Sequence, residues 1–85
     1  MKFTIVERKM KIDDDLRQYA LRKVEKLDRY FHQDSDTTLT FSELRGKQTV
    51  EITVRQTGLV VRAEETTTDM FASVDGAVSS IERQI

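Results

Sequence analysis

The chain has 85 residues, neither cysteine nor proline, and a formal net charge of -1. Its length suits one domain, and its 38% hydrophobic and 34% charged residues are typical of a soluble folded chain rather than a disordered one. The lack of cysteine excludes disulfides, thiolate zinc ligands and a thiol nucleophile. Because no apolar run reaches membrane length and the start of the chain does not read as a signal peptide, we expect one cytoplasmic domain over residues 1–85.

Charge is distributed unevenly along the chain. Residues 1–31 hold nine bases and six acids, for a net charge of +3, whereas residues 32–85 hold five bases and nine acids, for a net charge of -4. The two halves sum to the net charge of -1 for the whole chain. A local basic surface is therefore compatible with a slightly acidic protein.

Hydrophobic patterns predict a strand and then a helix in the first part of the chain. Residues 2–7 have the β-branched and aromatic composition of a strand. A helix should begin at Asp13, whose side chain can cap it, and should run to residue 31, because apolar residues recur there every three or four positions. That stripe consists of Leu16, Ala20, Val24, Leu27 and Phe31. Residues 32–36 break the pattern and should form a loop.

Three further strands and a second helix are predicted after this loop. Alternating residues indicate strands at 37–44, 49–56 and 59–65, separated by turns at 45–47 and 57–58. The second helix should start within TTTDM at 66–70, with one of the threonines as its cap and Asp69 in its first turn. Its apolar positions are Met70, Val74, Ala77, Val78, Ile81 and Ile85. Gly76, in the middle of this helix, should cost about 1 kcal/mol relative to alanine.

The predicted order β-α-β-β-β-α indicates an α+β fold. Three consecutive strands form a meander, and the first strand joins the sheet through a helical crossover. Because both helices carry one apolar stripe, both should cover the same face of a four-stranded sheet. The other face should be open to solvent, with threonines and mixed charges on it.

The first helix sorts its charges around its axis. On a helical wheel the bases of its segment 21–31 fall within about 120°, with Tyr19 and Tyr30 among them, while Glu25 and Asp28 lie elsewhere. The bases are Arg22, Lys23, Lys26 and Arg29. An ordinary solvent-exposed face with pairs at helical spacing would explain this pattern. A binding face for RNA phosphates is the alternative, and the pattern alone does not separate RNA from an acidic protein.

Several segments together resemble a known family. They are LRQYALRKVEKLDRYF at 16–31, RAEE at 62–65, DMFASVDGAV at 69–78 and IERQI at 81–85. In this order and spacing they resemble the N-terminal domain of the ribosome hibernation promoting factor family, also called ribosome-associated inhibitor or protein Y and once described as sigma-54 modulation proteins. The resemblance covers essentially the whole chain, and it implies a fold like that of a double-stranded-RNA-binding domain.

The resemblance also implies a function. Family members bind the small ribosomal subunit on 16S rRNA, where mRNA and tRNA pass, and stop translation by occlusion under stress or in stationary phase. No small-molecule substrate and no membrane would be involved. The residues that the resemblance implies as rRNA contacts are Arg22, Lys23, Lys26 and Arg29 on the first helix, Arg83 on the second, and also Tyr19 and Arg62.

The chain departs from the family pattern at its end. Ser79 and Ser80 stand where family members often carry a lysine, and the chain stops at Ile85, where relatives continue with a basic stretch. We therefore expect a lower affinity and a fragment of a longer protein. Longer relatives carry a linker and a C-terminal domain that joins two ribosomes, so ribosome dimerisation is expected only where such a domain exists.

Neither an enzyme nor a metal or cofactor site is expected. His32 is the only histidine and lies in the predicted loop, and helix capping explains the acidic run 13–15. Glu64 and Glu65 should point to opposite faces of a strand, so they cannot act together as an acid–base pair. The turn around Gly46 lacks the remaining residues of a phosphate loop. The rival hypothesis is a protein–protein adaptor or sigma-54 modulator that binds through the open sheet face or an edge strand.

Overall fold

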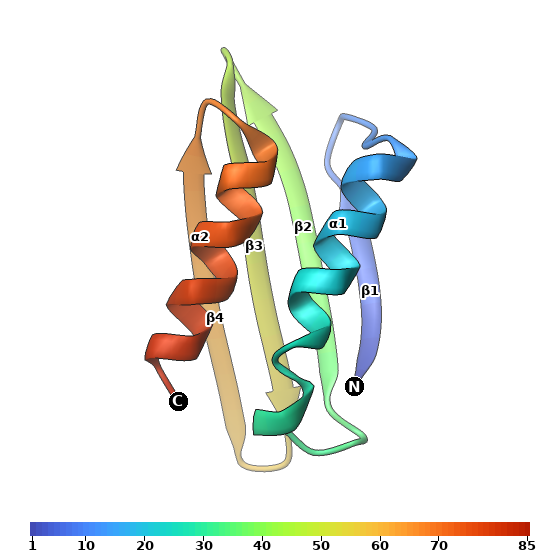
Figure 1. The fold of residues 1–85 in the computed structure, drawn as a ribbon, viewed down its shortest axis with the longest axis vertical. Helices are drawn as coiled ribbons and strands as arrows, with labels where there is room; N and C mark the ends of the chain where they lie inside the picture. Colours follow the sequence, from blue (N-terminus) through green and yellow to red (C-terminus); the bar gives the residue numbers. More distant parts are fainter.

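The computed structural model describes all 85 residues and has the predicted element order (Figure 1). Its elements are β1 (Lys2–Glu7), α1 (Asp14–Glu25), the short 3-10 helix η1 (Asp28–Tyr30), β2 (Asp36–Leu44), β3 (Lys47–Gln56), β4 (Leu59–Thr67) and α2 (Met70–Arg83). The predicted α+β class is confirmed; β1 has the predicted bounds, and the other three strands are one or two residues longer than the hydrophobic alternation indicated. None of the helices is long and apolar enough to cross a membrane.

The four strands form one sheet in the order β1-β2-β3-β4. Strand β1 runs parallel to β2, as the helical crossover through α1 requires, and the other neighbouring pairs are antiparallel. Both helices lie on the same face of the sheet, α1 over β1 and β2 and α2 over β3 and β4 (Figure 1). The opposite face carries no helix, so the prediction of an open sheet face is confirmed.

The hydrophobic core lies between the helices and the sheet. It contains 17 buried residues, and these include the predicted stripes of both helices together with alternate residues of the strands. The core residues with no exposed surface include Ala20, Val24, Leu27, Leu39, Phe41, Val50, Ile52, Val54, Val74, Ala77 and Ile81. Ile85, which was predicted to belong to the second stripe, is 56% exposed because α2 already ends at Arg83.

The first helix ends earlier than predicted. Helix α1 stops at Glu25, and a turn leads into η1. Backbone bonds of the i→i-3 type replace the helical pattern here, from the Leu27 N–H to the Val24 carbonyl (2.9 Å) and from the Tyr30 N–H to the Leu27 carbonyl (2.9 Å). Leu27 and Phe31 stay buried through this tighter winding. The wheel positions predicted for Arg29 and Tyr30 are wrong, because that wheel assumed an unbroken α-helix.

One of the two predicted helix caps is confirmed and the other is wrong. The carboxylate of Asp13 accepts a hydrogen bond from the Leu16 N–H at 2.9 Å, as expected for a cap. Helix α2 is capped by Asp69, which accepts from the Phe71 N–H at 3.0 Å, and not by a threonine. The reason is that β4 extends to Thr67, so the first two threonines belong to the strand.

Gly76 has a structural reason for its place in the middle of α2. A Cβ atom built there would lie 2.6 to 2.9 Å from atoms of the Glu65 side chain, which rises from β4. The helix therefore passes over Glu65 at a distance that only glycine allows without moving that side chain. Gly76 has a lower helix propensity than alanine, but it allows this close approach of α2 to the sheet.

Thr37 offers a test of the packing at the sheet–helix interface. Its side chain is 1% exposed on the helix-facing side of β2, and its hydroxyl makes no hydrogen bond. Valine has the same shape without the unpaired hydroxyl, so Thr37→Val should raise the free energy of unfolding by about 1 kcal/mol. Urea denaturation measures this change.

The matched control is Thr38→Val, at a half-buried position on the open face of the same strand. It should change the free energy of unfolding by less than about 0.5 kcal/mol. A Thr37→Val protein that is less stable than the wild type would show that the hydroxyl has a partner.

Candidate nucleic-acid interface

Most of the predicted contact residues lie at the C-terminal ends of the two helices. Arg22 and Lys23 are in the last turn of α1, Lys26 is its C-cap, and Arg83 is in the last turn of α2. Both helices run in the same direction across the sheet, so their C-terminal ends lie at the same end of the molecule (Figure 1). Cations at these positions are stabilised by the negative ends of the helix dipoles. This effect is a structural reason for the four bases that requires no ligand.

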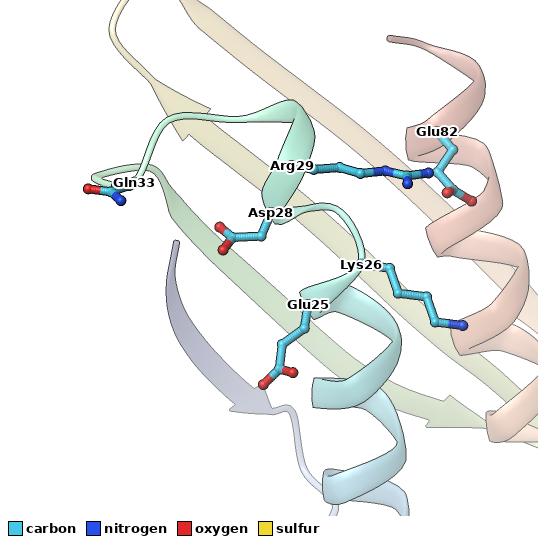
Figure 2. A pocket seen from close by; sticks show the side chains of 6 residues that line it. All are labelled: Glu25, Lys26, Asp28, Arg29, Gln33 and Glu82. Carbon is cyan, nitrogen blue, oxygen red and sulfur yellow. The ribbon is translucent and has the colours of Figure 1, made fainter.

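A polar hollow connects these two helix ends. It is lined by Glu25, Lys26, Asp28, Arg29, Gln33 and Glu82, none of them hydrophobic. Figure 2 shows that the side chains of Lys26 and Arg29 extend toward α2, whereas Glu25 and Asp28 point to the other side. A hollow without apolar lining does not suit a drug-like or cofactor-like ligand, which would need apolar walls. Its lining carries three carboxylates, from Glu25, Asp28 and Glu82, beside the two cations of Lys26 and Arg29.

Four of the predicted bases form no ion pair in the structure, and we call them the basic end. They are Arg22, Lys26, Arg29 and Arg83. Arg29 donates a hydrogen bond to the Tyr30 hydroxyl at 2.7 Å, and its guanidinium carbon lies 4.8 Å from the centre of that ring. Glu25, Asp28 and Glu82 line the same hollow as Lys26 and Arg29 without forming ion pairs with them, so these cations remain free to bind an external anion.

Lys23 differs from the basic end because it has an internal partner. Its ammonium lies 3.4 Å from a carboxylate oxygen of Asp75 on α2, and 5.6 Å from the centre of the Tyr19 ring. The Tyr19 hydroxyl donates to the same oxygen of Asp75 at 2.6 Å. Phe71 completes the group, since its ring centre lies 5.1 Å from that of Tyr19 in an edge-to-face arrangement. We call these four residues the interhelix clamp.

The interhelix clamp shifts the ionisation of Tyr19. The hydrogen bond to Asp75, partial burial and the negative charge of Asp75 raise the pKa of the Tyr19 hydroxyl above its ordinary value of 10.0, while Lys23 opposes the shift. The hydroxyl therefore remains a protonated donor throughout the neutral range. Because the pKa is higher in the folded state, this contact stabilises the fold below pH 10 and is lost as the pH rises through the raised pKa.

Sequence reasoning missed the role of Asp75 and of the exposed Phe71. Their spacing contained a signal, because Tyr19 and Lys23 are four residues apart on one helix and Phe71 and Asp75 are four apart on the other. Two such pairs, one aromatic and one charged residue in each, can face each other across two helices. Nothing in the linear sequence shows that these particular faces meet, since the hydrogen bond from Tyr19 to Asp75 spans 56 residues.

Arg62 lies apart from the other predicted contact residues. It pairs with Thr53 in the register of β3 and β4, on the open face of the sheet, and its guanidinium binds the Glu51 carboxylate at 2.6 Å. The sheet separates it from both helices. The structure therefore brings Arg22, Lys26, Arg29 and Arg83 to one end of the helix layer, with Tyr19 and Lys23 beside them, and does not bring Arg62 there.

The other candidate sites considered in the sequence lie apart in the structure. His32 is exposed after η1, and its backbone N–H donates to the Gln56 side chain at 2.8 Å. Glu64 is exposed on the open face, whereas Glu65 lies beneath Gly76 on the helix side. No group of three or more His, Asp or Glu side chains is arranged to hold a metal ion.

Comparisons with known proteins agree on one family. The family described as "Sigma 54 modulation protein / S30EA ribosomal protein" matches residues 3–85. The chain is 34% identical to a ribosome hibernation promotion factor of Lactococcus lactis subsp. cremoris and 35% identical to one of Deinococcus radiodurans. These matches cover 100% and 92% of the chain but only 48% and 44% of the two relatives, so the chain spans about half of their length.

Solved structures share the fold. The N-terminal domain of Thermus thermophilus Protein Y superposes with a TM-score of 0.87 at 33% identity, over 99% of this chain and 94% of that one. A ribosomal subunit interface protein from Coxiella burnetii gives a TM-score of 0.86 at 20% identity, over 99% and 92% of the two chains. The second likeness concerns the fold alone.

Titration of Tyr19 tests the geometry of the interhelix clamp. The chain has two tyrosines, so Tyr30→Phe leaves Tyr19 as the only phenol that absorbs at 295 nm. Its ionisation midpoint should lie above 10 in this variant. Adding Asp75→Asn should lower the midpoint, because the charge that repels the phenolate is gone.

Lys23→Met in the Tyr30→Phe background is a control that should shift the ionisation midpoint of Tyr19 in the opposite direction. Removing the nearby cation should raise the midpoint further. Circular dichroism across the titration confirms that the chain stays folded. A midpoint that does not respond to either substitution would contradict the contact between Tyr19 and Asp75.

Proposed function

The chain belongs to the family described as "Sigma 54 modulation protein / S30EA ribosomal protein", and from this premise we propose that it is a ribosome hibernation factor. It binds the small ribosomal subunit on its 16S rRNA, in the path of mRNA and tRNA, and stops translation by occupying that path. This action takes place in the cytoplasm, under stress or in stationary phase. It requires binding and no catalytic step, cofactor or small-molecule substrate.

The observation that supports this proposal most directly is the basic end. Arg22, Lys26, Arg29 and Arg83 come from both helices, are exposed, and have no carboxylate partner within the chain. Phosphates of an RNA backbone would supply the missing negative charge, and their binding releases counterions. The curated relatives in Lactococcus lactis and Deinococcus radiodurans are named as ribosome hibernation promotion factors, which agrees with an RNA-rich partner.

The predicted contact residues divide into three groups under this proposal. The basic end contacts phosphates directly. Lys23 contributes less than its charge suggests, because Asp75 already compensates that charge at 3.4 Å. Arg62 lies on the other face of the sheet and has no part in the same surface.

We assign to residues 1–85 the ribosome-binding step alone. They match about half of the length of the curated relatives from Lactococcus lactis and Deinococcus radiodurans. We propose that the joining of two ribosomes, where it occurs, belongs to the other half of such longer proteins.

The rival hypothesis, a protein adaptor or sigma-54 modulator, would use the open sheet face. The apolar residues exposed on that face are Val6 on β1, Leu44 at the end of β2 and Val60 on β4. Val6 and Val60 lie at opposite edges of the sheet. Between them the face carries threonines and the pair of Glu51 and Arg62. A protein-binding surface typically has a contiguous apolar patch, and this face lacks one. The structure therefore favours the basic end as the binding surface.

Charge reversal at the basic end tests the proposed function. The double variant Lys26→Glu/Arg29→Glu places two acids in the polar hollow and should lower the affinity for purified small ribosomal subunits by at least about 100-fold, since two attractive phosphate contacts become repulsive. Co-sedimentation at low salt measures the loss. Circular dichroism checks that the fold is unchanged, as expected for two exposed residues.

Lys47→Glu/Arg55→Glu is the matched control. Both residues are exposed on the open face of β3, and the net charge of the protein changes by the same amount. This variant should bind small subunits as the wild type does. Equal losses for the two variants would mean that net charge, and not the basic end, determines binding.

The salt dependence of the affinity for small ribosomal subunits measures the number of phosphate contacts. With four free bases at the basic end, a plot of log affinity against log salt concentration should have a slope of about -3 to -4. The single variant Arg83→Gln should make the slope shallower by about 1. A slope near zero would favour an apolar or strand-pairing partner instead.

A further inference from the structure

The surface between α1 and α2 has a second half whose chemistry differs from that of the basic end. This upper half is the interhelix clamp, where Tyr19 and Phe71 meet. At 1.5 Å per residue, Lys26 lies about 10 Å further along α1 than Tyr19, and Arg83 lies about 12 Å further along α2 than Asp75. The two halves are therefore neighbouring but separate parts of one surface.

An aromatic side chain is exposed in the upper half. Phe71 is 38% exposed although its ring also packs edge-to-face against Tyr19. It lies in the first turn of α2, two residues after the cap residue Asp69, whose carboxylate accepts a hydrogen bond from the Phe71 N–H. Leaving part of a phenyl ring in water forgoes hydrophobic stabilisation. The held ring thus offers a flat apolar surface between the helices.

Asp75 makes the upper half a poor site for phosphate. Its carboxylate repels anions and already compensates Lys23, the only base in the clamp. Both contacts of the carboxylate use Oδ1, at 2.6 Å from the Tyr19 hydroxyl and 3.4 Å from the Lys23 ammonium. Oδ2 makes no hydrogen bond, and the side chain is 47% exposed. An acceptor oxygen and an aromatic ring are therefore presented side by side.

We propose that the upper half of this surface is a subsite for one unpaired RNA base. The base stacks on Phe71, and its exocyclic amino group donates a hydrogen bond to Oδ2 of Asp75. This inference rests on the proposed function and adds to it a named ligand chemistry. Unpaired bases in RNA stack on aromatic side chains, and carboxylates accept hydrogen bonds from base amino groups. Adenine, cytosine and guanine carry such a group, whereas uracil does not.

With this subsite, the surface between the helices has two functions. The basic end holds phosphates of any RNA, so by itself it supplies affinity without selectivity. The upper half rejects phosphate and accepts a base, so it selects RNA in which one base is free beside a run of phosphates. Duplex RNA does not meet this requirement, because its bases are paired and stacked.

Phe71→Leu tests the subsite. Leucine keeps an apolar side chain against Tyr19 but removes the ring that a base stacks on. Affinity for purified small ribosomal subunits should fall by about 5- to 50-fold, and Phe71→Tyr, which keeps the ring, should restore it. The slope of log affinity against log salt should be the same in all three proteins, because the phosphate contacts remain.

Chemical footprinting on the subunit rRNA distinguishes base from backbone contacts. Dimethyl sulfate and kethoxal read the Watson–Crick edges of adenine, cytosine and guanine, and hydroxyl radicals read the backbone. In complexes formed at saturating protein, the wild type should protect an unpaired base that both Phe71→Leu and Asp75→Asn leave reactive, while backbone protections persist in all of them. Val60→Ala, which shortens an apolar side chain of 57% exposure on the open face, should keep every protection.

The outcomes separate this inference from the proposed function. A Phe71→Leu protein with the affinity and base footprint of the wild type overturns the subsite and leaves the proposed function standing. Loss of base and backbone protections together in a folded Phe71→Leu protein also overturns the subsite, because the ring would then be needed for all RNA contacts and not for one base. A wild type that does not bind small subunits at any salt concentration overturns both.

Discussion

One carboxylate oxygen links the two helices directly. Oδ1 of Asp75 on α2 accepts a hydrogen bond from Tyr19 and lies 3.4 Å from the ammonium of Lys23, both on α1. Other hydrogen bonds tie α2 to the strands, from Ser73 to the Gln48 carbonyl and from Gln84 to the Arg62 carbonyl, but neither of these joins the two helices. A short hydrogen bond at a half-buried position is directional. It fixes the register of α1 against α2, and with that register it fixes the distance between the bases at the end of α1 and Arg83 at the end of α2.

Periodicity predicted most of the fold because burial requires it. A strand residue that faces the helices must recur at every second position, and a helix residue that faces the sheet at every third or fourth. The end of α1 was predicted less well, since Leu27 and Phe31 fit an α-helix and also fit the turn and 3-10 helix that the chain adopts. The cap of α2 was assigned to a threonine because the extension of β4 to Thr67 depends on pairing with β3, which local sequence does not show.

The sequence predicted the part of the candidate site that lies on α1, and it did not predict contacts with other elements. The wheel placed Arg22 and Lys26 on one flank of α1, and the structure keeps them there, exposed and without a carboxylate partner. The compensation of Lys23 was not predictable, because its partner Asp75 comes from another helix. The sequence also left the face of Arg62 undetermined, and only the register of β4 places it on the open side. A net charge of -1 thus coexists with a basic end, although Glu25, Asp28 and Glu82 lie close to Lys26 and Arg29 in the polar hollow.

We propose that the basic end occupies the path of mRNA and tRNA on the small ribosomal subunit. Co-sedimentation of the wild-type chain with purified small subunits, at low salt, with and without mRNA and initiator tRNA, tests this directly. We expect binding that the two RNAs displace together at saturating concentration, because they and the protein require the same rRNA surface. Binding that persists unchanged in the presence of both RNAs would contradict occlusion and would place the protein elsewhere on the subunit.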